Sequence, residues 1–111
     1  MSGRLPAARS RTFYAVADAL GAGDRDLAPA LAAWLSAASP RDARALLRFL
    51  ALLEQLPRAT RAGHRGFAWL PRALRARWLD AVSRAPLPGA ARHVATLRGI
   101  VREGLQSPPG P

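Results

Sequence analysis

Hydrophobic residues along most of the chain recur every three or four positions, which is the spacing of one face of an α-helix. The clearest run lies within residues 40–56, where the apolar positions are Leu46, Phe49, Leu50, Leu53 and Leu56. Arg41, Arg44 and Arg48 gather on the opposite side of the same predicted helix. No segment alternates as a strand does, and β-branched residues are scarce. The pattern therefore predicts an all-α chain.

Five helices are expected, over residues 8–20, 27–37, 40–56, 70–84 and 88–105. Gly21 and Gly23 suit the end of the first helix, and Asp26 can cap the second. Ser39 followed by Pro40 is a strong signal for the start of the third. Pro57 allows one further turn, with a kink. Short loops between these helices favour a compact bundle.

Each predicted helix has one apolar face that we expect to point inward. Outside the third helix these positions are Phe13, Ala17 and Leu20; Leu31, Trp34 and Leu35; Leu70, Leu74, Trp78, Ala81 and Val82; and Val94, Leu97, Val101 and Leu105. There is no internal repeat. We expect an N-terminal arm over residues 1–7, one helical domain over 8–105 and a disordered tail over 106–111.

Charge and composition narrow the possible functions. The 111 residues carry a net charge of +10, which invites binding to nucleic acid or to an acidic protein. All 17 basic residues are arginine, a bias that codon usage in a GC-rich genome would also produce. The absence of cysteine excludes disulfides, thiolate metal sites and a cysteine nucleophile. No apolar run approaches the roughly 20 residues that span a bilayer. With no export signal recognised, we expect a cytoplasmic protein.

Residues suited to catalysis are few and scattered. A whole predicted helix separates His64 from His93, and neither has a companion at metal-ligand spacing. No pair of carboxylates suggests general acid–base chemistry, and no glycine loop precedes a helix to hold phosphate. Asp80 and Arg84 are placed for a helix-surface ion pair. We expect no catalytic, metal or cofactor site in this chain, and hence no enzyme activity of its own.

The segment "GFAWLPRALRARWLDAV", residues 66–82, combines aromatic and basic residues more densely than the rest of the chain. Helical spacing favours a buried Trp78, and Phe67 and Trp69 suit the anchoring of helices to one another. Arg72, Leu79 and Arg75 lie outside the predicted apolar face. They form either a solvated face with one incidental leucine or an apolar spot rimmed by arginine that binds a protein. Arg75 could also brace a loop through backbone carbonyls.

Several of these motifs resemble the small-subunit family named after gluconate 2-dehydrogenase subunit 3. The resemblance rests on Phe67, Leu70, Arg75 and Leu79, preceded by "LLRFLALLEQL" and followed by "LPGAARHVATLRGIVREGL". The opening "RTFYAVADALGAGD" is similar to the family's first helix and turn, although the turn lacks the proline that is usual there. The resemblance covers about residues 9–105.

This resemblance implies a non-catalytic subunit that binds and stabilises a separate FAD-carrying oxidoreductase chain of the glucose–methanol–choline type. The partner-binding residues would be Phe67, Trp69, Arg72, Arg75 and Leu79. The family often carries a twin-arginine export signal, for which this sequence leaves no room before its first helix, so a cytoplasmic complex is expected. An arginine-rich nucleic-acid-binding domain is the alternative.

Overall fold

The computed structural model describes residues 7–23, 25–60 and 66–106, which form five α-helices, one short 3₁₀ turn and no strand. The elements are α1 (Ala7–Ala19), α2 (Ala28–Ala37), α3 (Pro40–Thr60), η1 (Phe67–Trp69), α4 (Arg72–Arg84) and α5 (Ala90–Gln106). The Cα radius of gyration is 13.6 Å, close to the roughly 13 Å expected for a compact domain of this length. The predicted all-α bundle of about five helices is confirmed.

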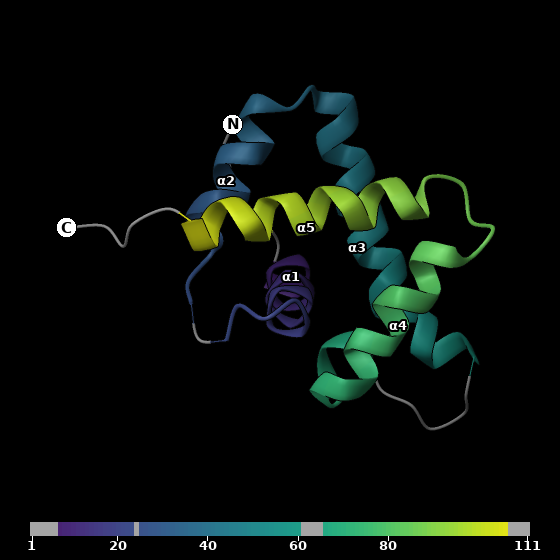
Figure 1. Cartoon of the computed structure of the whole chain (residues 1–111). Helices are drawn as coiled ribbons and strands as arrows, with labels where there is room; N and C mark the ends of the chain where they lie inside the picture. Colours follow the sequence, from purple (N-terminus) through teal and green to yellow (C-terminus); the bar gives the residue numbers. More distant parts are fainter. Residues whose placement is uncertain (1–6, 24, 61–65, 107–111) are drawn as a thin grey trace.

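Helix α1 lies at the centre of the bundle. Figure 1 shows it nearly end-on, with α5 passing across it, and it packs against α3, α4, α5 and η1. Burial follows from this position: from Thr12 to Ala17 only Tyr14 is exposed. The small side chains of Ala15 and Ala17 leave room for neighbouring helices to approach closely. The sequence predicted one inward face for this helix, whereas the structure buries most of its circumference.

The apolar stripes of α3 and α5 form much of the remaining core, as predicted. Leu46, Phe49, Leu50 and Leu53 of α3 are buried, and Leu56 is half-buried. On α5, Val94, Leu97 and Val101 are buried, as is Ile100 beside them. These stripes have the strict three-and-four spacing from which burial is most directly predicted.

Local capping signals are also confirmed. Gly21 adopts φ 95° at the end of α1, and the next residue, Ala22, donates its N–H to the Ala17 carbonyl at 3.0 Å. This is the helix end that favours glycine. Asp26 accepts the Ala28 N–H at 3.0 Å, and the Ser39 hydroxyl accepts the Asp42 N–H at 3.1 Å.

Three predicted helix ends, at residues 37, 40 and 84, coincide with the observed ones, and the others differ by one to four residues. Helix α3 continues past Pro57 to Thr60, the further turn that the sequence allowed. The segment 67–69 forms η1, and Leu70 and Pro71 are extended, so α4 starts at Arg72 rather than at residue 70. At the chain ends, Ala7 and Gln106 are helical, although they were predicted to belong to the arm and the tail.

The predicted inward face of α4 was partly right: Leu70 and Val82 are buried as predicted, but the observed face lies about one residue step further around the helix. Leu74 is 38% exposed and Ala81 is exposed, whereas Leu79 is only 2% exposed. Trp78 is half-buried rather than buried. The face that meets the core is formed by Arg75, Leu79 and Val82, at spacing i, i+4 and i+7. The prediction treated Arg75 as an outward residue, so the predicted face does not coincide with the observed one.

The orientation of α4 can be tested by truncating one leucine on each side. Leu79→Ala should lower the free energy of unfolding by about 2–5 kcal/mol, because it removes a fully packed side chain. Leu74→Ala, the matched control on the exposed side, should lower it by less than about 1 kcal/mol. Urea denaturation of both variants measures the difference. Equal costs would show that α4 is not oriented as described.

Candidate partner-binding surface

The structure divides the five predicted partner-binding residues into three groups. Phe67 and Leu79 belong to the hydrophobic core, with exposed fractions of 0% and 2%. Arg72 and Arg75 come together on one carboxylate. Trp69 is 58% exposed. Phe67 and Leu79, which were predicted to contact a partner, are instead buried where they hold η1 and α4 against the bundle, so the structure offers neither of them as a surface residue.

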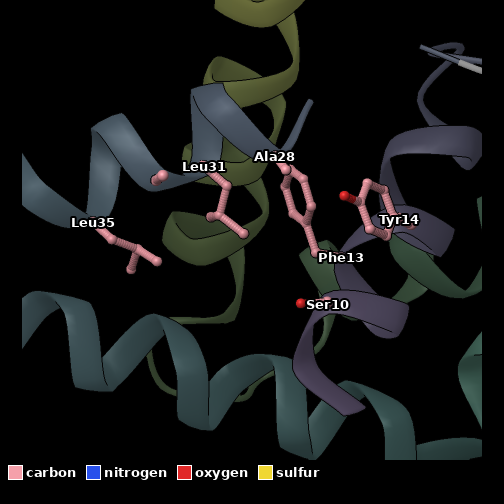
Figure 2. A pocket seen from close by; sticks show the side chains of 7 residues that line it. Ser10, Phe13, Tyr14, Ala28, Leu31 and Leu35 are labelled. Atoms are coloured by element: carbon pink, nitrogen blue, oxygen red, sulfur yellow. The ribbon is translucent and has the colours of Figure 1, made fainter. Parts of the chain in front are cut away.

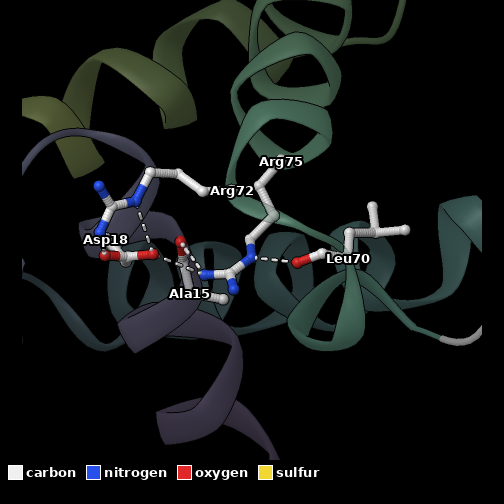
Figure 3. A network of polar contacts seen from close by, with 5 residues as sticks. All are labelled: Ala15, Asp18, Leu70, Arg72 and Arg75. Carbon is white, nitrogen blue, oxygen red and sulfur yellow. Dashed lines mark hydrogen bonds and ion pairs between the residues drawn. The ribbon is translucent and has the colours of Figure 1, made fainter.

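Asp18 of α1 binds both arginines of the first turn of α4. As Figure 3 shows, the Arg72 guanidinium donates from Nη2 to Oδ1 at 2.7 Å and from Nε to Oδ2 at 3.2 Å. Arg75 Nη1 donates to Oδ2 at 3.1 Å. The planar guanidinium of Arg72 thus forms the bidentate pair for which arginine is suited. Asp18 ties the end of α1 to the start of α4.

Arg75 also donates to two backbone carbonyls. Its Nε donates to the Leu70 oxygen at 2.6 Å, and its Nη1 lies 3.4 Å from the Ala15 oxygen. The side chain is 18% exposed, against 66% for Arg72. This confirms that Arg75 braces a loop through carbonyls. Because its donors already face these acceptors inside the molecule, we assign Arg75 to the fold rather than to a partner surface.

The helix dipoles explain why this cluster needs both signs of charge. A carboxylate near the C-terminus of α1 and cations in the first turn of α4 each lie at the unfavourable end of their own helix. Together they neutralise one another. The hydrogen bond from Arg72 is the main cause that holds the pKa of Asp18 below its ordinary value, with further electrostatic attraction from both arginines and an opposing effect of burial.

Glu54 fixes the turn that carries Trp69. Its Oε1 accepts the hydroxyl of the buried Thr12 at 2.8 Å and the N–H of Ala68 at 3.0 Å. One carboxylate on α3 thereby connects α1 to η1. Phe67 points inward from this turn and Trp69 remains exposed. The backbone on either side of Trp69 is thus held in place, so its indole is presented on a rigid support.

The start of α4, which follows Trp69 in the chain, is exposed over most of its circumference. Residues 71–74, 76 and 77 are exposed, and within this range only Arg75 turns inward. The exposed apolar side chain of Leu74 and the exposed Arg77 lie one helical turn apart. We refer to Trp69, Leu74 and Arg77 as the Trp69 surface. Tryptophan and arginine are the residues most enriched at energetically important protein contacts.

A second apolar feature lies between α1 and α2. It is an open groove of about 190 Å³, and Figure 2 shows its labelled lining residues, which are Ser10, Phe13, Tyr14, Ala28, Leu31 and Leu35. Tyr14 donates its hydroxyl to Asp26 at one end, at 3.3 Å. No charged side chain lines the groove. The groove could not be predicted from the sequence, because it depends on how two helices diverge.

Of the two histidines, only His93 lies in the part of the chain that the structure describes. His93 stacks on Phe49 with ring centroids 5.0 Å apart. Burial is the main cause that lowers the pKa of His93; the positive charge of Arg92 lowers it further, and the negative charge of Asp42 raises it by less. His64 lies outside the described residues. Within the described ranges, no three His, Asp or Glu residues are grouped so that they could hold a metal ion. None of the described helices is long and apolar enough to cross a membrane.

Asp18, Glu54 and Thr12 were not singled out as important by sequence reasoning. Thr12 and Glu54 are 42 residues apart, and Arg72 and Asp18 are 54 apart, so no local spacing could reveal either contact. One signal was available for Glu54, since this charged residue directly follows the apolar run of residues 49–53. Asp80 and Arg84, four residues apart, do form the predicted ion pair, at 3.3 Å.

Removing each arginine in turn should distinguish their contributions to stability. Arg75→Ala should lower the free energy of unfolding by about 2–3 kcal/mol, because it leaves partly buried carbonyl groups and Asp18 with fewer donors. Arg72→Ala should cost less than about 1 kcal/mol, since exposed ion pairs contribute little. Urea denaturation at neutral pH measures both. A larger cost for Arg72 would contradict the structural role given to Arg75.

The lowered pKa of Asp18 predicts a pH dependence of stability. Because the pKa is lower in the folded state than the ordinary value of 3.8, ionised Asp18 stabilises the fold above that value and loses this contribution as the pH falls through the folded-state pKa. The stability difference between the natural chain and Asp18→Asn should therefore shrink from pH 6 towards pH 3. Thermal unfolding of both chains across this range measures it. A difference independent of pH would show that the charge of Asp18 is unimportant.

Comparison with other proteins gives no information on the function of this chain. Searches against known protein families, curated proteins and solved structures find no match to this chain. The family resemblance of the sequence therefore supports a proposal only.

Proposed function

We propose that this chain is a non-catalytic accessory subunit that binds and stabilises a larger protein through the Trp69 surface. The observation that supports it most directly is an exposed tryptophan on a turn fixed by Glu54, followed along the chain by an exposed leucine and an exposed arginine in the first two turns of α4. A rigid aromatic anchor loses little conformational entropy on binding, which favours such a residue as the centre of an interface.

The charge of the chain indicates the chemistry of the partner. With a net charge of +10, association is fastest and most selective with an acidic surface. Arg77 places a cation one turn from Leu74, so the matching patch would be an apolar pocket with a carboxylate at its rim. The resemblance described above suggests a flavin-dependent oxidoreductase as the partner, with FAD and the catalytic residues in that chain and a cytoplasmic complex as the result.

Nucleic-acid binding is the second candidate, and one observation favours it. Arg41, Arg44 and Arg48 are all exposed on one side of α3, over a length of about 10 Å. A row of arginines can neutralise successive phosphates. The Trp69 surface is not needed for this function. Substitutions at Trp69 and at Arg44 should therefore affect different candidate functions.

Affinity purification of the tagged full chain from its native host tests the accessory-subunit proposal. We expect one larger protein in constant stoichiometry, with flavin absorbance. Trp69→Ala should reduce the recovered partner by about tenfold or more, as for the removal of a central anchor. Leu52→Ala is the matched control, because Leu52 is another exposed apolar residue, on α3.

The same purified sample distinguishes the two candidate functions. Nucleic acid that binds at physiological salt, is lost steeply with added salt and depends on Arg44 rather than on Trp69 would favour the second candidate. A partner that lacks flavin but depends on Trp69 would support the Trp69 surface as a docking site and would show that the partner is not a flavin-dependent oxidoreductase. Equal recovery with Trp69→Ala and Leu52→Ala would refute the Trp69 surface itself.

A further inference from the structure

The groove between α1 and α2 exists because the two helices pack on other parts of the bundle. Helix α1 packs mainly on α3, α4 and η1, whereas α2 packs on α5. Gly104 of α5 permits that second contact: a Cβ there would lie 2.6 Å from Leu27 Cδ2 and 3.2 Å from the Cβ of Ala30. With α2 drawn towards α5, the space beside Phe13 and Leu31 is left open.

The α2 side of this groove differs in charge from the rest of the chain. No residue from 27 to 40 is charged, although the protein as a whole has a net charge of +10. Asp26 stands at one end, where it accepts hydrogen bonds from Tyr14 and from the Ala28 N–H. The neighbouring Arg25 donates to the Leu105 carbonyl at 3.2 Å, which directs its guanidinium to the end of α5. None of the ion pairs found among the described residues involves Asp26.

Size limits what can occupy the groove. An apolar cavity of about 150 Å³ holds one benzene ring, and sites for cofactors or drug-sized ligands are usually about 300–1,000 Å³. The groove, at about 190 Å³, therefore fits one large apolar side chain. A second copy of the chain is disfavoured, because α2 offers a charge-free strip only about 15 Å long and about 10 Å wide, far below the roughly 800 Å² per partner of a stable interface.

We propose that the α1–α2 groove binds a single leucine- or phenylalanine-sized side chain of a partner helix that carries an arginine or lysine one turn away, against Asp26. The apolar group fills the space beside Phe13 and Leu31, and the cation pairs with the carboxylate at the Tyr14 end. This inference uses a surface separate from Trp69 and does not depend on the identity of the partner proposed above.

Three helical peptides of about 20 residues test this assignment. All are alanine-based and otherwise identical. One carries leucine and, one turn away, arginine; the second has glutamate in place of arginine; and the third has alanine in place of leucine. Each is titrated into the full chain while the methyl NMR signals of Ala28, Leu31 and Leu35 are followed.

The leucine–arginine peptide should shift these methyl signals, and the alanine–arginine peptide should not. Replacement of arginine by glutamate should weaken binding by about two- to fivefold, the range of an exposed ion pair. The global charge of +10 predicts the opposite order, since it attracts glutamate, so the sign of the difference reports on Asp26 alone. Asp26→Asn, which keeps an oxygen for the Ala28 N–H, should remove the preference for arginine.

Ala32→Gln places a longer side chain over the groove at an exposed helical position and should abolish the shifts while the chain stays folded. The proposal is overturned if no methyl signal in the groove moves at millimolar peptide, or if the glutamate peptide binds as tightly as the arginine peptide. Shifts that survive in Ala32→Gln would equally refute it, because the peptide would then bind elsewhere.

Discussion

The carboxylate of Asp18, held by two arginines, ties the start of α4 to the end of α1. The side of α4 that is exposed follows from that contact. Arg75 has to turn inward to reach Asp18 and the Ala15 and Leu70 carbonyls. Helical geometry then carries Leu79 and Val82, four and seven positions later, into the core. The same rotation turns Leu74 and Arg77 outward. The charged cluster is therefore structural, and the candidate binding surface is its consequence on the other side of the helix.

A comparable constraint separates the two aromatic residues of η1. Successive residues of a 3₁₀ turn are about 120° apart, so Phe67 and Trp69 cannot both face the core. Glu54 fixes the turn by accepting the N–H of Ala68. Phe67 is consequently buried and Trp69 exposed. The sequence suggested that both anchor helices to each other, since their spacing alone does not show how a short turn would be held.

The parts of the fold that the sequence predicted are those decided by nearby residues. The stripe from Leu46 to Leu53, the cap at Ser39 and the glycine turn at Gly21 all depend on contacts within a few positions. The face of α4 depends instead on Asp18, more than 50 residues away, and no local rule assigns an arginine to the inside. For the candidate site the same limit applies. Of the five residues predicted to bind a partner, only Trp69 and Arg72 are substantially exposed, and Arg72 already pairs with Asp18.

The two proposed contacts place apolar groups beside charges of opposite sign. The Trp69 surface includes Arg77, whereas the α1–α2 groove ends at Asp26. A polyanion can bind at the first, because 17 of the 24 charged residues are basic, but the carboxylate of Asp26 repels it at the second. A partner that engages both has to present an acid and a base in the right places, and each mismatched charge would cost affinity. Selectivity on such a strongly basic chain would therefore come from the apolar groove that ends at Asp26 rather than from its arginines.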